Sequence, residues 1–145
     1  MKVSADELWA AAVERRKITW ARRTLHQVRH KAKERQLACS ITLADIDTPI
    51  LCPFSLRKLN YFNRKRDWDS PCLERYEPGL GYVKGNVFTA SYWISSVKAG
   101  RGWGVFEAEA EKILAEALKV YMIEHPSIDP ALAFLRKQIN DALGD

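Results

Sequence analysis

Residues 74–98 read ERYEPGLGYVKGNVFTASYWISSVK, and this stretch decides which fold the sequence can adopt. Residues 72–76 are typical of a short strand, and a turn-rich segment with three glycines and one proline follows at 77–85. Residues 87–90 are typical of a returning strand. Ser91 is a suitable N-cap for a short helix over the rest of the stretch. The pattern therefore predicts a strand–loop–strand–helix unit that is too small to form a core of its own.

The segment ahead of this unit predicts one long helix. Ser4 followed by Glu7 has the form of a capping box, which places the start of the helix near Ala5. No proline or glycine interrupts residues 5–37, where good helix formers dominate. One face carries apolar residues at steps of three and four, namely Ile18, Ala21, Leu25, Val28 and Ala32. This stripe predicts the side of the helix that packs on a core.

A row of basic residues lies beside that stripe on the same predicted helix. At 100° per residue its members fall within about 60° of one another and extend over about 27 Å. We call this row the basic ridge, and it comprises Arg15, Arg22, His26, Arg29 and Lys33. We expect the ridge to contact a polyanion on the same side as the 74–98 unit. A charge distribution that serves only solubility is the alternative interpretation.

Outside these two segments the pattern predicts a mainly helical α+β fold with a small sheet. Thr42 followed by Asp45 predicts a short helical turn, residues 50–61 a small hairpin, and residues 63–71 a charged loop. Two apolar periodic segments beyond Gly100 predict two C-terminal helices, the second of which begins at Asp129. We expect one domain over 1–145, divided into a basic helix at 1–36, a hairpin and charged loop at 37–70, the strand–loop–strand–helix unit at 71–99 and a helical pair at 104–143.

Length and composition narrow the class of protein. The chain has 145 residues and a net charge of +5, with 47% hydrophobic and 28% charged residues, which is typical of one globular domain. No stretch reaches the ~18 apolar residues of a transmembrane helix, and the N-terminal residues lack the apolar core of a signal peptide. We therefore expect a cytoplasmic protein with no membrane partner. Three cysteines without CxxC spacing disfavour a disulfide framework and a four-cysteine zinc site.

The basic residues are concentrated at the front of the chain. Residues 1–36 hold ten Lys or Arg against four Asp or Glu, whereas residues 101–145 hold five against eight. A basic N-terminal part and an acidic C-terminal part indicate that one side of the molecule faces a polyanion. Trp68, between two aspartates in a polar loop, is a candidate contact to a partner.

The 74–98 stretch resembles the ββα-metal motif of HNH (His-Me finger) endonucleases, in the form found in phage and mobile-element proteins. The string GYVKGNV, with acids upstream and a lysine downstream, carries the resemblance. The upstream strings RHKAKERQL, TLADI and CPFSL are similar to the lead-in of the same group. The resemblance implies binding of duplex DNA and cleavage of a phosphodiester with Mg or Mn as cofactor.

The resemblance also implies roles for single residues. Glu74 takes the place of the aspartate that holds the metal, and Asn86 that of the asparagine that orients the loop. Lys98 matches the basic residue that contacts phosphate. Arg75 stands where the best-known members have a histidine base, and arginine accepts no proton near neutral pH. Ser95 replaces the second metal ligand and is a poor one, so we expect cleavage to be weakened or lost.

Three functional hypotheses follow from the residues and the resemblance. The first is a DNA-binding protein of HNH-endonuclease type, encoded by a phage or mobile element, with weakened or lost cleavage. The second is an active Mg- or Mn-dependent endonuclease that nicks or cuts both strands. The third is a phage protein that inhibits a host protein in the host cytoplasm, using a reused nuclease scaffold and its acidic C-terminal helices. The expected phosphate contacts are Arg15, Arg22, Arg29, Lys33, Arg64, Lys65, Arg66, Lys84 and Arg101.

Overall fold

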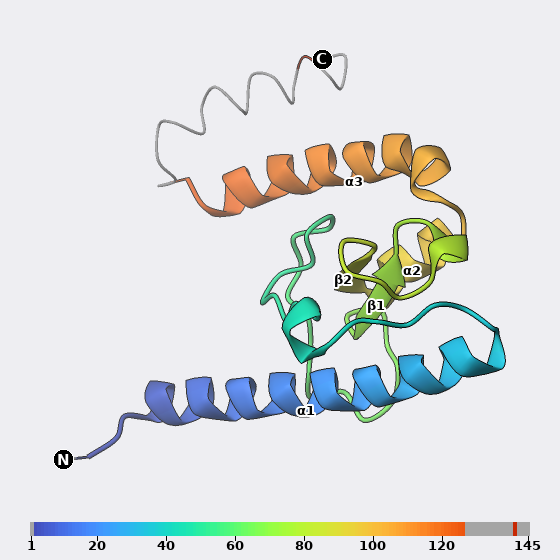
Figure 1. The fold of residues 1–145 in the computed structure, drawn as a ribbon. Coiled ribbons are helices and arrows are strands. Elements are labelled where there is room, and N and C mark those ends of the chain that lie inside the picture. The colour runs from blue at the N-terminus through green and yellow to red at the C-terminus, as the bar shows by residue number, and fades with distance from the viewer. Residues whose placement is uncertain (1, 127–140, 142–145) are drawn as a thin grey trace.

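The computed structural model describes residues 2–126 and 141 of the chain (Figure 1). Within them it is a mixed α+β fold with three α-helices and a two-stranded antiparallel hairpin. The predicted helix that begins at Asp129 lies outside the described residues. The elements are α1 (Ala5–Glu34), the 3₁₀ turn η1 (Leu43–Asp45), β1 (Pro71–Arg75), the 3₁₀ turn η2 (Pro78–Leu80), β2 (Val87–Ser91), α2 (Tyr92–Lys98) and α3 (Trp103–Glu124).

Helix α1 begins where its capping signal predicts. The backbone N–H of Glu7 donates to Ser4 Oγ at 3.1 Å, and the N–H of Ser4 donates to Glu7 Oε2 at 3.0 Å. Four residues of the predicted apolar stripe are buried, but Ile18 is 48% exposed, so its assignment to the core was wrong. Ile18 lies at the edge of the stripe nearest the basic ridge, which explains its exposure. The helix ends at Glu34, earlier than predicted, because Gln36 adopts a positive φ of 56°.

The hairpin forms the middle layer of the molecule, with α1 on one side and α3 on the other (Figure 1). Strands β1 and β2 pair so that Glu74 lies opposite Phe88. Because side chains alternate across a strand, the hairpin has two different faces. Phe88 and Ala90 join a core with Phe106 of α3, whereas Leu73 and Val87 pack against a second core formed by the apolar stripe of α1. The hairpin thus holds the two long helices apart.

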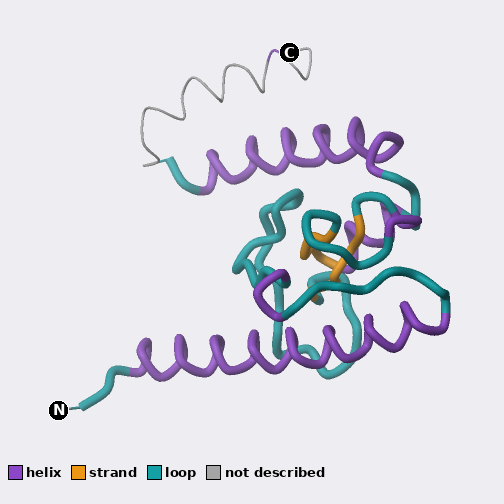
Figure 2. Tube along the Cα trace, in the orientation of Figure 1, coloured by secondary structure: helices purple, strands orange, loops and turns teal. Residues whose placement is uncertain are grey.

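The connection from α1 to β1 is mostly loop (Figure 2). The predicted turn at Thr42 is present as η1, with Asp45 accepting from the Thr42 N–H at 2.8 Å. The hairpin expected over residues 50–61 is reduced to an isolated bridge between Leu51 and Lys58. Pro53 has no backbone N–H to offer to a strand ladder, and Leu56 takes a positive φ of 57°. Both residues lie in the turn between Leu51 and Lys58, where the chain reverses direction.

Helix α2 follows β2 directly. Ser91 Oγ accepts from the N–H of Ile94 at 3.2 Å and caps the helix as predicted. Ala99 and Gly100 then adopt positive φ angles of 52° and 72°, which end α2 and turn the chain into α3. The 74–98 unit therefore contributes residues to both cores. Among the described residues, no helix is long and apolar enough to span a membrane.

Candidate nucleic-acid interface

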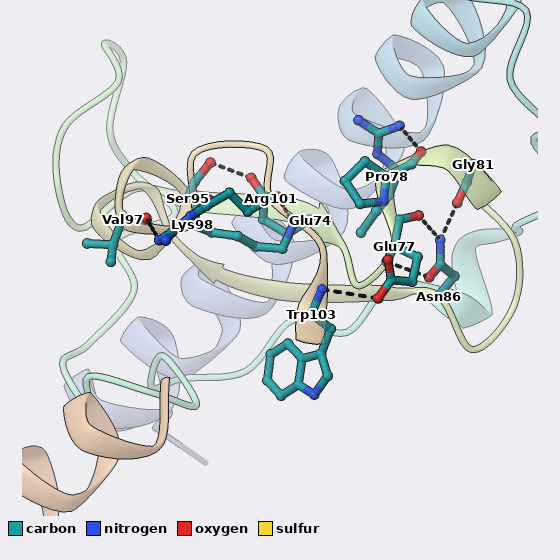
Figure 3. A network of polar contacts seen from close by, with 11 residues as sticks. Glu74, Glu77, Pro78, Gly81, Asn86, Ser95, Val97, Lys98, Arg101 and Trp103 are labelled. Atoms are coloured by element: carbon teal, nitrogen blue, oxygen red, sulfur yellow. Dashed lines mark hydrogen bonds and ion pairs between the residues drawn. The ribbon is translucent and has the colours of Figure 1, made fainter. Parts of the chain in front are cut away.

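The loop between β1 and β2 is held by the side chain of Asn86 (Figure 3). Asn86 Oδ1 accepts from the N–H of Glu77 at 3.0 Å, and its Nδ2 donates to the carbonyls of Glu77 and Gly81 at 2.9 and 2.7 Å. Asn86 is buried, so these bonds replace the water that its amide would otherwise bind. The asparagine therefore closes the loop into one defined conformation.

Two further side chains fasten this loop to its surroundings. Glu77 Oε1 accepts from the backbone N–H of Trp103 at 3.2 Å, which places a carboxylate at the N-terminus of α3 (Figure 3). Arg75 Nη1 donates to the Pro78 carbonyl at 2.7 Å, and its guanidinium lies 4.9 Å from the centre of the Tyr82 ring. Arg75 is thus a loop-fixing cation here, and its guanidinium offers no base to a water molecule.

Glu74 projects toward helix α2, where it meets two residues of the predicted site (Figure 3). One carboxylate oxygen accepts a hydrogen bond from the Ser95 hydroxyl, and the other lies 3.9 Å from Lys98 Nζ. The Lys98 side chain is 1% exposed, and its ammonium has no hydrogen-bond partner among the described residues. Burial lowers the pKa of Lys98, although the nearby Glu74 carboxylate opposes that shift. The structure thus brings Glu74, Ser95 and Lys98 together.

These residues do not fit a site for Mg or Mn. Such ions prefer carboxylate and water oxygens in an octahedral arrangement, whereas Glu74 is engaged with a hydroxyl and an ammonium. In the described part of the chain no group of three or more His, Cys, Asp or Glu side chains is placed to hold a metal ion. Cys72 is nearby, but burial raises the pKa of its thiol and disfavours the thiolate.

A groove of about 590 Å³ runs between α1, the loop at 60–66 and strand β1. Eight cationic side chains line it, and Glu74 is the one carboxylate among its described lining residues. None of the eight forms an ion pair within residues 2–126. They are Arg16, Arg23, Lys31, Arg35, Arg64, Lys65, Arg66 and Arg75. We call this surface the basic groove.

The basic ridge does not line this groove. All five of its residues are exposed, but on a different flank of α1. Arg15 and Arg22 belong to the ridge, whereas their neighbours Arg16 and Arg23 line the groove, and consecutive residues lie about 100° apart around a helix. The expectation that the ridge faces the same side as the 74–98 unit was therefore wrong. The basic residues that face this unit lie on the other side of the apolar stripe.

The other predicted phosphate contacts divide into three groups. Arg64, Lys65 and Arg66 are exposed and line the basic groove. Lys84 is exposed outside the groove lining. Arg101 instead donates to the Val97 carbonyl at 2.7 Å and pairs with Glu109 at 2.7 Å, so it joins the end of α2 to α3.

Four groove residues were missed by sequence reasoning, namely Arg16, Arg23, Lys31 and Arg35. Their steps of seven, eight and four place them on one flank of α1, so the charge pattern did contain a second basic row. Which of the two rows lines the groove depends on how the hairpin packs against α1. That information is tertiary and is absent from the helix sequence.

Comparisons with protein-family models, with curated proteins and with solved structures find no match to this chain. We therefore infer a function from the residues and the geometry of the basic groove.

Proposed function

We propose that this chain is a DNA-binding protein of HNH-endonuclease type, encoded by a phage or mobile element, in which metal-dependent cleavage is weakened or lost. The observation that carries the proposal is the basic groove, where eight cations without ion-pair partners among the described residues face a single carboxylate. Cations that line a groove release counterions from a phosphate backbone when they bind it, and this release drives association.

The two walls of the groove are suited to a sugar–phosphate backbone. On one wall, the row from Arg16 to Arg35 extends over about 28 Å along α1, at 1.5 Å per residue. On the other wall, the loop at 64–66 supplies three consecutive exposed cations. Because such contacts reach phosphates rather than base edges, they support binding that tolerates many sequences.

The surroundings of Glu74 support the second half of the proposal. An endonuclease of this type needs a metal-bound or base-activated water, but Glu74 is engaged by Ser95 and Lys98. Arg75 cannot serve as a general base. Of the residues that the resemblance marks as catalytic, Glu74 and Lys98 are thus paired with each other, and this pairing supports binding over cleavage.

Duplex binding is expected to weaken steeply with salt. A 20-base-pair duplex that contacts about five phosphates should give a log–log salt slope of about −4 to −5, because each neutralised phosphate contributes about −0.9. Fluorescence anisotropy with a labelled duplex, titrated at several NaCl concentrations, measures this slope. A flat salt response would contradict the proposal.

Cleavage is expected to be absent or marginal with Mn²⁺. Supercoiled plasmid incubated with wild-type protein should show no more nicking than plasmid without protein, and Glu74→Ala should give the same result, because Glu74 is already paired. Agarose gel electrophoresis of a time course measures the fraction nicked. Clear nicking by wild type that Glu74→Ala abolishes would favour the active endonuclease, whereas equal nicking by both proteins indicates a contaminant.

A further inference from the structure

An aromatic stack of Trp68 and Tyr92 borders the basic groove. The rings of Trp68 and Tyr92 are stacked, with centroids 5.5 Å apart and planes inclined by 22°. The guanidinium of Arg66 lies 5.0 Å from the centre of the Tyr92 ring. Trp68 remains 58% exposed although tryptophan is the largest apolar side chain. An indole that packs against another ring and is exposed to solvent can stack with a further planar group.

The stack separates two concave surfaces. Tyr92 lines the basic groove, and Trp68 lines a second cavity of about 480 Å³. That second cavity also contains the exposed indole of Trp93 and the cations Arg57 and Lys58. A nucleic-acid strand that passes from the groove over Tyr92 and Trp68 would therefore contact a second set of aromatic and cationic side chains. We call this second surface the tryptophan cavity.

The chemistry of the tryptophan cavity favours unpaired nucleotides over paired ones. Bases within a duplex are stacked on their neighbours and offer only their edges, whereas an unpaired base offers its whole π face to an aromatic side chain. The cavity also contains Asp69, but its Oδ1 accepts from Asn63 Nδ2 at 2.7 Å, so that carboxylate is engaged within its own loop. Indoles with flanking cations match a ligand made of planar rings and phosphates.

We infer that the Trp68–Tyr92 stack binds an unpaired base where a single strand leaves the basic groove. The substrate class is therefore DNA in which a duplex continues into a single-stranded extension. This inference rests on the proposed function, because the groove must first hold the adjoining backbone. Arg57 and Lys58 then contact phosphates of the extension in the tryptophan cavity.

The test compares three labelled probes in fluorescence anisotropy with the full chain. One is a blunt duplex, the second is the same duplex with a six-nucleotide single-stranded extension, and the third carries the same extension with abasic sites. The abasic probe keeps the added phosphates and removes the bases, so it separates stacking from charge. Wild type is expected to bind the base-containing extension about tenfold more tightly than the abasic one, as stacking on an aromatic side chain predicts.

Two variants assign this preference to Trp68. Trp68→Ala should lose the preference while keeping the affinity for the blunt duplex, which also shows that the variant is folded. Trp68→Phe retains a ring and should keep most of the preference. Equal wild-type affinity for the base-containing and abasic extensions, or a preference that survives in Trp68→Ala, overturns the inference while the proposed function stands. Failure of all three probes to bind overturns the proposed function, and the inference with it.

Discussion

Reversing two charges within the basic groove, in the double variant Arg23→Glu and Lys31→Glu, is expected to lower the affinity for duplex DNA by about a hundredfold or more. Both side chains are exposed and line the groove. A hydrogen bond to a charged group contributes about 1.5–3 kcal/mol, so the loss of two such contacts accounts for this factor. The salt slope should also become shallower by about two, since two fewer phosphates are neutralised.

The ridge offers a control matched in charge and position. Arg22→Glu with Arg29→Glu changes the net charge by the same amount on exposed positions of the same helix. These residues lie outside the groove lining, and charges beyond the Debye length of about 8 Å are largely screened at physiological salt. We expect affinity to fall only a few-fold in fluorescence anisotropy. Equal losses in the two double variants would contradict binding in the groove.

Replacing Gly81 by alanine is expected to destabilise the fold by about 2–5 kcal/mol, the sum of a left-handed backbone and an overpacked contact. Gly81 has a φ of +79°, and a Cβ atom there would lie 2.3 Å from the carbonyl oxygen of Ala38. That oxygen cannot move away easily, because it accepts from the N–H of Tyr82 at 2.8 Å. Urea unfolding followed by circular dichroism measures the loss as a lower midpoint.

Gly79 supplies the control in the same loop. A Cβ atom at Gly79 meets no atom within 4 Å, and its φ lies outside the left-handed region. Gly79→Ala should therefore shift the free energy of unfolding by no more than about 0.5 kcal/mol, as for most exposed positions. Indistinguishable midpoints for the two variants would show that the loop relaxes away from Ala38 at little cost.

The parts of the fold that the sequence predicted well are those governed by local signals. The capping residues Ser4 and Ser91 mark the starts of α1 and α2, and the two strands begin and end within one residue of their predicted limits. Each of these signals acts over a few residues, because a cap bonds to a backbone N–H within the first turn. The hairpin predicted at 50–61 is present in a shortened form, with Leu51 bridged to Lys58 and the N–H of Cys52 donating to the Arg57 carbonyl at 2.8 Å.

The candidate site was predictable in its residue types and less so in its geometry. A helix with one apolar stripe has two flanks, and the spacing of Arg22 and Arg23 alone does not show which flank meets an open surface. The stack of Trp68 on Tyr92 depends on tertiary bonds, since the N–H of Tyr92 donates to the Ser70 carbonyl at 2.8 Å. Such pairings arise only when the loop at 63–70 folds back on α2.

The buried ammonium of Lys98 couples folding to proton uptake and release. Its pKa in the folded state lies below the ordinary value of 10.5, so over the interval between the two values the unfolded chain binds more protons than the folded one. In that interval, unfolding takes up a proton at Lys98, and this residue's contribution to the free energy of unfolding rises with pH. Below that interval, Lys98 is charged in both states, and its burial lowers the free energy of unfolding by the full cost of removing the ammonium from water. This is the residue that the resemblance matches to a phosphate contact.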